Sequence, residues 1–335
     1  MKRILFSLVL VILVLSVALV GYVAEEKLEW NENWPTKIRI GTGNIGGGSY
    51  MCGSTLRNVL MEEFPDIEVI VEVSHSSVAN VKVMEAGDFE IATCTTEIAH
   101  DAWKGVDDQV FEGKKYQSFR ILMPRTTGAN MFITLKKYGI TNVKQFTGKF
   151  SAGDAGGSND IFVRKAFETL GVESEVINIS ISDSVDALRS GIIQGFVIGH
   201  PNPAVEELAL LEDIEILGIN GKDAETFLES NPLFSYPIVV PGGYYKGIDE
   251  PIEAVGVVTI FIARADLPED MVYTILKAWY KHPEIIEATW PVLLKGTDPD
   301  QIKGISQFAP LHKGSIKYYE EIGAEIGEKA ILLNE

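Results

Sequence analysis

The sequence predicts an α/β protein made of two α/β lobes, each a largely parallel sheet covered by helices. Strand-like and helix-like segments alternate in units of about 25 to 35 residues, the spacing of parallel strand–helix–strand units. A strand, glycine loop and helix occur at residues 38–56, and the same pattern begins again at 148–171. This repetition indicates a second domain, for which a chain of 335 residues is long enough.

The first lobe is predicted to begin with three strand–helix pairs. Each strand is a short apolar or alternating run, and each helix carries apolar residues at helical spacing. In chain order, the predicted strands and helices occupy residues 37–43 and 49–64, 66–77 and 78–87, and 89–96 and 97–105. Their alternation predicts parallel strands joined by helices.

The segment FRILMPRTTGANMFITL, residues 119–135, is too long for one simple strand, and we expect it to be a crossing segment. The second lobe then begins with the strand, glycine loop and helix at 148–171. The alternation continues through residues 175–180, 184–191, 192–200 and 255–280, and the tail is helical.

The N-terminal residues 1–24 have the pattern of an export signal. Lys2 and Arg3 precede an apolar run from Ile4 to Val20, and small and polar residues follow. The cleavage site is poor, so an uncleaved membrane tether remains the alternative. Either interpretation predicts an extracytoplasmic protein, in the periplasm or at the cell surface.

The charge of the chain limits its partners. The formal net charge is −18, and it becomes −20 without the two basic residues of the N-terminal segment. Such an acidic surface argues against nucleic acid or anionic lipid as a partner. An anionic ligand would have to be captured locally, against the overall field.

The chain has two cysteines, Cys52 and Cys94, and neither belongs to a metal-binding pattern. The five histidines are scattered without metal-ligand spacing, so we expect no metal site. Outside the cytoplasm the two cysteines could pair. A disulfide and two buried free thiols are therefore both open.

Polar residues gather where the predicted strands end and the next helices begin. In an open parallel sheet these ends share one edge, where ligands bind. Hydroxyls, amides and free backbone N–H groups, together with one arginine, are suited to holding carboxylates and hydroxyls. The candidate ligand-binding residues are Thr42, Gly47, Gly48, Ser49, Tyr50, Ser74, His75, Ser76, Ser77, Asn80, Thr95, Thr96, Glu97, Arg125, Thr126, Gly157, Ser158, Asn159 and Asn202.

This set lacks an activated nucleophile with its base, so we expect a binding protein without a cofactor and not an enzyme. The strongest rival is a dinucleotide site, because Gly41, Gly43 and Gly46 fit G-x-G-x-x-G between a strand and a helix. Its acidic partner is missing, since Glu72 lies inside the second strand and Ser74 follows at its tip. A nicotinamide-dependent oxidoreductase is therefore disfavoured.

Five stretches carry a resemblance to a known family. They are IRIGTGNIGGGSYMCGSTL, VSHSSVANVKVMEAGDFEIATCTTEIAHDAWKG, GIIQGFVIGHPNPAVEELA, IDEPIEAVGVVTIFIARADLPEDMVYTILKA and PLHKGSIKYY. In this order, over about residues 37 to 320, they resemble successive blocks of the TAXI family, the extracytoplasmic solute receptors of TRAP transporters.

The resemblance implies a type II periplasmic-binding-protein fold, in which two α/β lobes joined by a hinge close on a ligand. We expect residues 36–124 with 259–325 to form lobe 1 and residues 125–258 to form lobe 2. The implied function is capture of a small organic anion, a dicarboxylate or a glutamate-like amino acid, by a monomeric receptor. The implied partner is a TRAP permease, often fused into a single protein in this family.

The motifs match the family only in part. In the first loop Thr42, Gly43, Gly46, Gly47 and Tyr50 match, whereas Gly48 and Ser49 stand where threonine and tyrosine are usual. The other loops also combine matches with departures: Ser77, Val78, Asn80, Gly157 and Ser158 match, whereas Ser74, His75, Ser76, Glu97 and Asn159 differ. These departures put glutamate itself in doubt, while a carboxylate ligand stays the expectation.

A sensor is the alternative function. An exported module that reports ligand occupancy to a signalling partner would have the same fold, and a tether that is never cleaved would favour it. A permease gene beside this one would favour transport.

Overall fold

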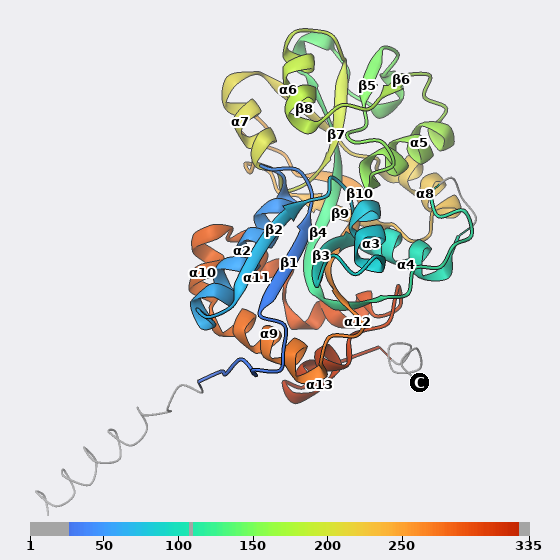
Figure 1. Ribbon diagram of the computed structural model, residues 1–335. Helices are drawn as coiled ribbons and strands as arrows, with labels where there is room; N and C mark the ends of the chain where they lie inside the picture. The colour runs from blue at the N-terminus through green and yellow to red at the C-terminus, as the bar shows by residue number, and fades with distance from the viewer. Residues whose placement is uncertain (1–26, 107–109, 328–335) are drawn as a thin grey trace, which may run out of the picture.

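The structure is a computed structural model that describes residues 27–106 and 110–327. The segment 1–24, predicted as a signal or tether, lies outside the described residues. Two α/β lobes meet at a waist (Figure 1), so the predicted α/β class and two-lobe architecture are confirmed. Strands of both lobes join in one curled sheet of order β2-β1-β3-β10-β4-β7-β5-β6, which β4 continues from one lobe to the other.

The first lobe begins with the three predicted strand–helix pairs. Strand β1 (Lys37–Thr42) lies between β2 (Glu68–Val73) and β3 (Ile91–Thr95), and all three are parallel. The helices that follow these strands are α2 (Gly48–Glu63), α3 (Ser77–Glu85) and α4 (Thr96–Lys104). The carboxyl ends of the strands therefore deliver three helix N-termini to one edge of the sheet.

Two long antiparallel strands run through the waist. Strand β4 (Phe119–Leu135) has the bounds predicted for the crossing segment, but it is one strand of 17 residues, whereas the sequence predicts a segment too long for one simple strand. It serves both lobes, and β10 (Ile252–Arg264) pairs with it from Arg264 back to Gly256 with register shifts. In the first lobe β10 lies between β3 and β4. Beyond the waist both strands continue into the second lobe, where β4 pairs with β7 and β8 and the start of β10 pairs with β9.

The second lobe is built on the other end of β4. Its strands are β5 (Lys149–Ser151), β6 (Glu175–Ile177), β7 (Gly195–Gly199), β8 (Ile214–Leu217) and β9 (Ser235–Val240). Its helices are α5 (Ser158–Leu170), α6 (Ile181–Arg189), α7 (Pro203–Leu211) and α8 (Gly221–Ser230). The sequence pattern missed β8, which is very short, and β9, an edge strand that contains Pro237.

The C-terminal helices return to the first lobe. Helix α9 packs against α2 and α13, and α10 also contacts α2. In Figure 1 these helices lie below and beside the first strands. Their bounds are α9 (Glu269–Lys281), α10 (Pro283–Thr289), α11 (Val292–Gly296), α12 (Ile302–Ile305) and α13 (Lys313–Glu321).

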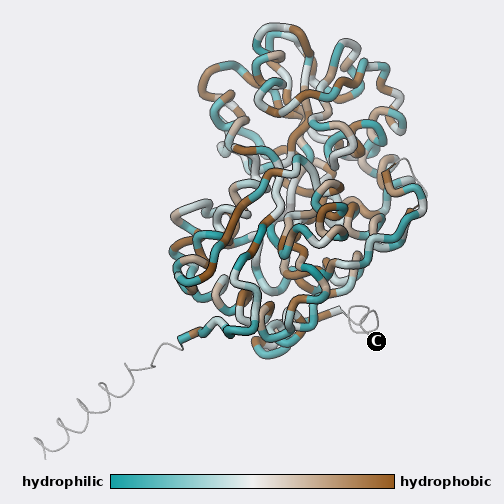
Figure 2. Tube along the Cα trace, viewed as in Figure 1, coloured by the Kyte–Doolittle hydropathy of each residue, from teal (hydrophilic) through white to brown (hydrophobic). Residues whose placement is uncertain are grey.

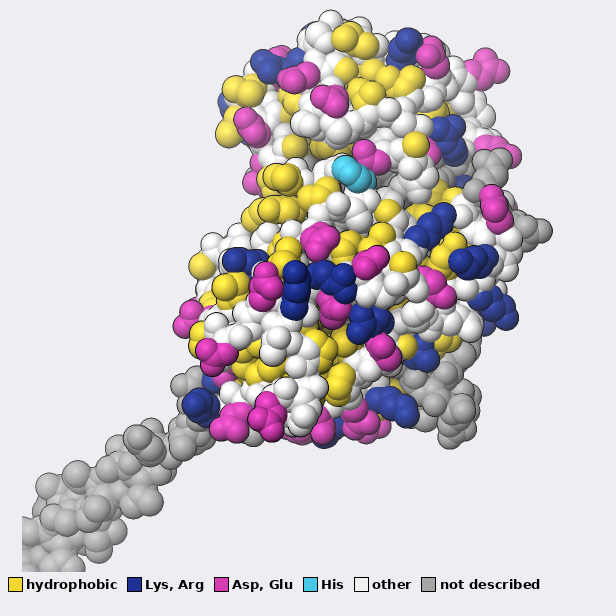
Figure 3. Space-filling model, viewed as in Figure 1, with side chains coloured by type: hydrophobic (Ala, Val, Ile, Leu, Met, Phe, Trp, Pro, Cys, Tyr) yellow, Lys and Arg dark blue, Asp and Glu magenta, His cyan; other side chains and the backbone are white. Residues whose placement is uncertain are grey.

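Separate apolar cores support the two lobes. The core of the first lobe combines buried residues from Ile38 to Met123 with others from Ile260 to Tyr319. Two clusters in the second lobe contain residues from Ala129 to Val257. Figure 2 shows apolar segments along strands of both lobes, while Figure 3 shows charges of both signs scattered over one face and a narrow waist between the lobes.

Glycines allow the two crossing strands to approach closely. A Cβ atom on Gly256 would lie 2.0 Å from the backbone oxygen of Gly128, a distance that no side chain tolerates. The contact falls where β4 and β10 leave the first lobe. The waist therefore depends on a position without a side chain.

Replacing Gly256 with alanine should destabilise the protein by about 2 kcal/mol or more, because backbone atoms must move apart to admit the methyl group. Urea denaturation would measure the change in the free energy of unfolding. Gly304→Ala is the control, since a Cβ there meets no atom within 4 Å. Equal unfolding free energies for both variants would contradict this account of the waist.

Candidate functional site

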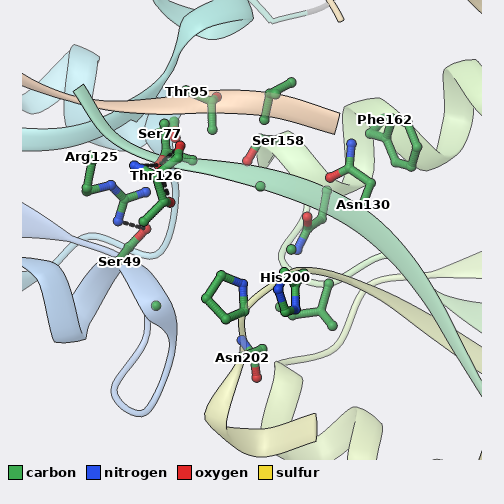
Figure 4. A pocket seen from close by; sticks show the side chains of 18 of the residues that line it. Ser49, Ser77, Thr95, Arg125, Thr126, Asn130, Ser158, Phe162, His200 and Asn202 are labelled. Carbon is green, nitrogen blue, oxygen red and sulfur yellow. Dashed lines mark hydrogen bonds between the residues drawn. The ribbon is translucent and has the colours of Figure 1, made fainter. Parts of the chain in front are cut away.

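A cavity of about 150 Å³ lies at the waist, between the two lobes. We call it the inner cavity. Its walls come from the N-termini of α2, α3, α4 and α5, from both crossing strands, and from the loop after β7 (Figure 4). The lining residues are Gly48, Ser49, Ser77, Thr95, Glu97, Arg125, Thr126, Gly128, Asn130, Ser158, Asn159, Phe162, Ile198, Gly199, His200, Pro201, Asn202, Phe234, Val257, Thr259 and Trp290.

A second cavity of about 690 Å³, the outer cavity, shares part of this lining. Gly48, Ser49, Ser77, Ser158 and Asn159 contribute to both. The remaining walls of the outer cavity come mainly from the glycine loop after β1, the loop after β2 and the loop after β5. The two cavities are therefore neighbouring parts of one interlobe cleft.

Arg125 is the charged centre of the inner cavity. Its side chain comes from β4 and is only 4% exposed. One guanidinium nitrogen, Nη1, donates a hydrogen bond to Ser49 Oγ at 3.2 Å, while Nε has no partner. Within residues 27–106 and 110–327, no carboxylate forms an ion pair with it. A buried guanidinium without a counter-ion is costly, so this cation is suited to an anion from outside the chain.

Other polar atoms without partners line the same cavity. They are Thr95 Oγ1, Glu97 Oε2 and Asn130 Nδ2, and each belongs to a buried residue. Buried polar groups in native proteins nearly always find a partner. Their convergence on one cavity indicates a place for a polar ligand.

Burial sets the protonation of two further groups. Glu97 lies in the first turn of α4, where burial raises the pKa of its carboxyl group to about 7. Burial lowers the pKa of His200 to about 4, so this imidazole is neutral near pH 7. His200 Nδ1 lies 3.0 Å from the hydroxyl of Tyr245, which holds the ring in place. Arg125 is thus the cation of the inner cavity at neutral pH.

A chain of hydrogen bonds crosses the mouth of the cleft. Asn44, in the loop after β1, donates from Nδ2 to Asp154 Oδ2 of the second lobe at 2.6 Å. Asn44 Oδ1 lies 2.8 Å from His75 Nδ1 in the first lobe. We call these three residues the clasp. Because the clasp joins loops of opposite lobes, it favours the arrangement in which the cleft is covered.

Most of the predicted site residues lie around the cleft. Those that line one or both cavities are Gly47, Gly48, Ser49, His75, Ser76, Ser77, Asn80, Thr95, Glu97, Arg125, Thr126, Ser158, Asn159 and Asn202. Lining a cavity does not test whether a residue binds a ligand, so these roles stay predictions.

The other predicted site residues do not line either cavity: Thr42, Tyr50, Ser74, Thr96 and Gly157. The Thr42 hydroxyl donates to the Glu72 carbonyl oxygen at 2.9 Å, and the Ser74 hydroxyl donates to the Thr42 carbonyl oxygen at 3.0 Å. Tyr50 faces a separate groove on the surface. The hydroxyls of Thr42 and Ser74 therefore connect the ends of β1 and β2 and do not face the cleft.

Two lining asparagines already have structural hydrogen bonds. Asn80 Nδ2 donates to the Thr93 carbonyl oxygen at 2.8 Å, which ties α3 to β3. Asn202 Oδ1 accepts from the backbone N–H of Ala204 at 3.0 Å and caps α7. Asn130 differs from both, because its Nδ2 is free to meet a ligand.

Sequence reasoning missed the apolar part of the lining. Phe162, Phe234, Val257 and Trp290 lie far apart in the sequence and look like ordinary core residues. Trp290 approaches the glycine loop so closely that a Cβ on Gly48 would lie 2.9 Å from its ring. Only the fold brings these side chains together, so no local pattern could have found them.

The two cysteines are free thiols in the structure, in agreement with the second of the two alternatives left open by the sequence. Both are buried, Cys52 in α2 and Cys94 in β3, and burial raises the pKa of both thiols. The Cys94 thiol donates to the Thr95 carbonyl oxygen at 3.3 Å. Each cysteine therefore fills the core as a small apolar residue.

The G-x-G-x-x-G pattern also has a structural explanation. A Cβ on Gly41 would lie 2.3 Å from the ring of Phe89, so this glycine is needed for packing. Gly46 has a φ of +80°, a conformation that favours glycine. Strand packing and loop geometry therefore explain both glycines without a dinucleotide.

The family model of the NMT1-like family matches residues 40–323. The chain belongs to the NMT1-like family. This match covers the strands of both lobes and every residue named above as lining the inner cavity.

Solved structures share the fold of this NMT1-like chain. The periplasmic binding protein BugD has a TM-score of 0.56 at 13% identity, covering 87% of this chain and 97% of that chain. A structure described as a periplasmic transporter has a TM-score of 0.53 at 14% identity, covering 89% and 94%. The aliphatic sulphonate binding protein SsuA from Escherichia coli has a TM-score of 0.48 at 12% identity, covering 89% and 97%. At these identities the first two matches establish the periplasmic-binding-protein fold alone.

The described residues contain neither a membrane-spanning helix nor a metal-binding cluster. None of the helices in that part of the chain has the length and apolar character needed to cross a membrane. No group of three or more His, Cys, Asp or Glu side chains there could hold a metal ion.

The raised pKa of Glu97 makes stability depend on pH. Because the folded state binds a proton that the unfolded state loses from about pH 4.5, stability should fall as the pH rises from about 4.5 to about 7. The negative charge of Asp101 also raises the pKa of Glu97, whereas the positive charge of Lys165 lowers it. Glu97→Gln should remove this loss and raise the free energy of unfolding at pH 8 by about 1–3 kcal/mol, with little change at pH 4.

Chemical denaturation across this pH range would measure the effect. The exposed Glu225→Gln is the matched control and should leave the pH profile unchanged. A Glu97→Gln profile parallel to that of the parent protein would mean that Glu97 is not protonated in the folded state.

The clasp should slow local opening of the cleft. Asn44→Ala removes both of its hydrogen bonds, each worth about 0.5–1.5 kcal/mol, so amide exchange in loops 43–48 and 153–157 should become about tenfold faster. Hydrogen–deuterium exchange with mass spectrometry measures this directly. Asn220→Ala, at a helix N-cap without a side-chain bond, should not change exchange in these loops. Unaltered exchange in Asn44→Ala would show that the clasp does not hold the lobes.

Proposed function

We propose that this protein is an extracytoplasmic solute receptor that captures a small organic anion and delivers it unaltered to a membrane transporter. The observation that carries the proposal is Arg125, a buried guanidinium without a carboxylate partner among the described residues, which lines an interlobe cavity. The NMT1-like family match and the periplasmic-binding-protein fold support it.

In this mechanism the ligand's carboxylate pairs with Arg125, which Ser49 orients through the hydrogen bond to Nη1. Hydroxyls of Ser77 and Thr126 lie on the same wall, and Ser158 and Asn159 approach from the second lobe. A ligand that contacts both lobes stabilises the closed arrangement, because its affinity for the open one is lower. The closed shape is then what the transporter recognises.

The finer assignment follows the TAXI resemblance. The transporter would be a TRAP-type permease in its fused form, and the receptor would be a monomer with dicarboxylates and glutamate-like amino acids as first candidate ligands. We propose lobe boundaries at 36–124 with 259–325 and at 125–258. The residues of the apolar cores, which change lobe between Met123 and Ala129 and between Val257 and Ile260, support these limits.

Arg125→Ala should weaken ligand binding by about tenfold or more, because it removes the charged partner from a buried contact. Mass spectrometry of small molecules released from the purified full chain would supply candidate ligands. A thermal-shift screen with succinate, glutarate, glutamate and aliphatic monocarboxylates would extend them. Calorimetric titration of each hit would then compare the variant with the parent protein.

Arg189→Ala is the matched control, because it removes a charge of the same sign from an exposed position on α6. Arg125→Lys keeps the charge but loses the planar fork, so its affinity should lie between those of the parent and Arg125→Ala. Equal affinity in Arg125→Ala and the parent would remove Arg125 from the site. If the purified protein bound none of these anions, the proposed function would be wrong.

A further inference from the structure

The two ends of the inner cavity differ in chemistry. At one end Arg125 bonds Ser49, and Ser77 lies nearby (Figure 4). Figure 4 places Asn130 and Phe162 on the opposite side. Phe234 and Val257 also line the cavity, and with Phe162 they belong to one buried cluster of the second lobe, whereas the apolar ring of Trp290 lies against Gly48, beside Ser49.

No lysine or arginine of the second lobe lines either cavity in the described part of the chain, although Lys165 of α5 is close enough to act on the pKa of Glu97. Among the described residues that line the two cavities, Arg125 is the one Lys or Arg side chain. His200 is neutral near pH 7, and Asp154 adds a carboxylate at the mouth. A second carboxylate of a ligand would therefore be desolvated without a positive partner, which costs several kcal/mol.

The N-terminus of α5 already has an internal carboxylate beside it. Its first turn contains Asp160, a carboxylate that is 6% exposed. Asp160 Oδ2 accepts from the backbone N–H of Gly156 at 2.9 Å, and its Oδ1 accepts from Arg164 at 2.8 Å. The Asp160 carboxylate thus already lies at the positive end of the helix dipole of α5.

We propose that the ligand is a monocarboxylate with an uncharged apolar body, its carboxylate on Arg125 and its body against Phe162, Phe234 and Val257. This inference rests on the proposed function and narrows it, since it disfavours the dicarboxylates and glutamate that the TAXI resemblance suggested. Asn130 Nδ2, unpartnered and aimed into the same end, donates to a neutral oxygen where the ligand has one.

Pairs of isosteric acids test the inference. In 4-methylpentanoate an isopropyl group replaces one carboxylate of succinate, and in 5-methylhexanoate it replaces one carboxylate of glutarate. Each member of a pair therefore has nearly the same shape and differs in charge at the far end. Calorimetric titration of the purified full chain at pH 7 should give each monocarboxylate at least about tenfold tighter binding than its dicarboxylate partner.

A positive charge added to the cavity from the second lobe should reverse this preference. Ser158→Lys places an ammonium at the first residue of α5, which lines the inner cavity, and should favour succinate and glutarate over their isosteres. Ser182→Lys is the matched control, because Ser182 lines the outer cavity alone. The control should keep the preference of the parent protein.

The possible outcomes distinguish a failure of the monocarboxylate assignment from a failure of the proposed receptor function. Dicarboxylates that bind as tightly as their isosteres, with affinity that depends on Arg125, would overturn the monocarboxylate assignment and leave the anion receptor standing. A preference for monocarboxylates that Ser158→Lys leaves unchanged would also overturn the proposed orientation. Absence of Arg125-dependent binding to any of these acids would instead overturn the proposed function.

Discussion

One buried cation organises this cleft. Arg125 lies on β4 where that strand passes from one lobe to the other, so its position depends on the pairing of β4 with β10. Gly256 allows that pairing to be close, and Gly296 lets α11 press against the backbone of Arg125, since a Cβ on Gly296 would lie 1.9 Å from the Arg125 carbonyl oxygen. The backbone of Arg125 is thus held by β10 and α11, while its side-chain Nε has no hydrogen-bond partner. The rest of the cleft is arranged around a charge that has no ion-pair partner in the described part of the chain.

The lobes contribute different chemistry to that charge. The first lobe supplies hydroxyls at helix N-termini, such as Ser49 and Ser77, and these suit an oxyanion. The second lobe supplies aromatic and aliphatic side chains from its own core, such as Phe162 and Val257. The division is not complete, because Ser158 and Asn159 of the second lobe add polar groups and Trp290 of the first-lobe core adds an apolar ring.

Much of the fold could be predicted from the sequence, since periodicity and glycine loops are local signals. The crossing segment at 119–135 was predicted with the bounds of β4, and the three strand–helix pairs of the first lobe are confirmed within a few residues. The short edge strands β8 and β9 were not predicted, because tertiary pairing rather than pattern defines them. The sequence also could not distinguish a Cys52–Cys94 disulfide from two buried free thiols, because the direction of the Cys94 side chain depends on how its strand is placed in the sheet.

The candidate site could be predicted only where polar residues follow strand ends. That rule found Arg125, Ser49 and Ser158, but it also selected Thr42 and Ser74, whose hydroxyls bond backbone carbonyls. A sequence does not distinguish a hydroxyl that faces a cavity from one that closes a strand end. It likewise does not identify Trp290, which reaches the cleft from near the far end of the chain.

The division of the cores has a consequence for how the protein is assembled. Every residue of the second lobe's apolar clusters lies between 129 and 257, whereas the first lobe's core needs residues from both ends of that interval, up to Tyr319. During synthesis, all residues of the second core have therefore been added to the chain well before those of the first core. The apolar residues of β1, β2 and β3 can be fully buried only after β10 and α9 have been synthesised. Premature truncation in the last quarter of the gene would thus leave one finished half and one exposed, aggregation-prone half.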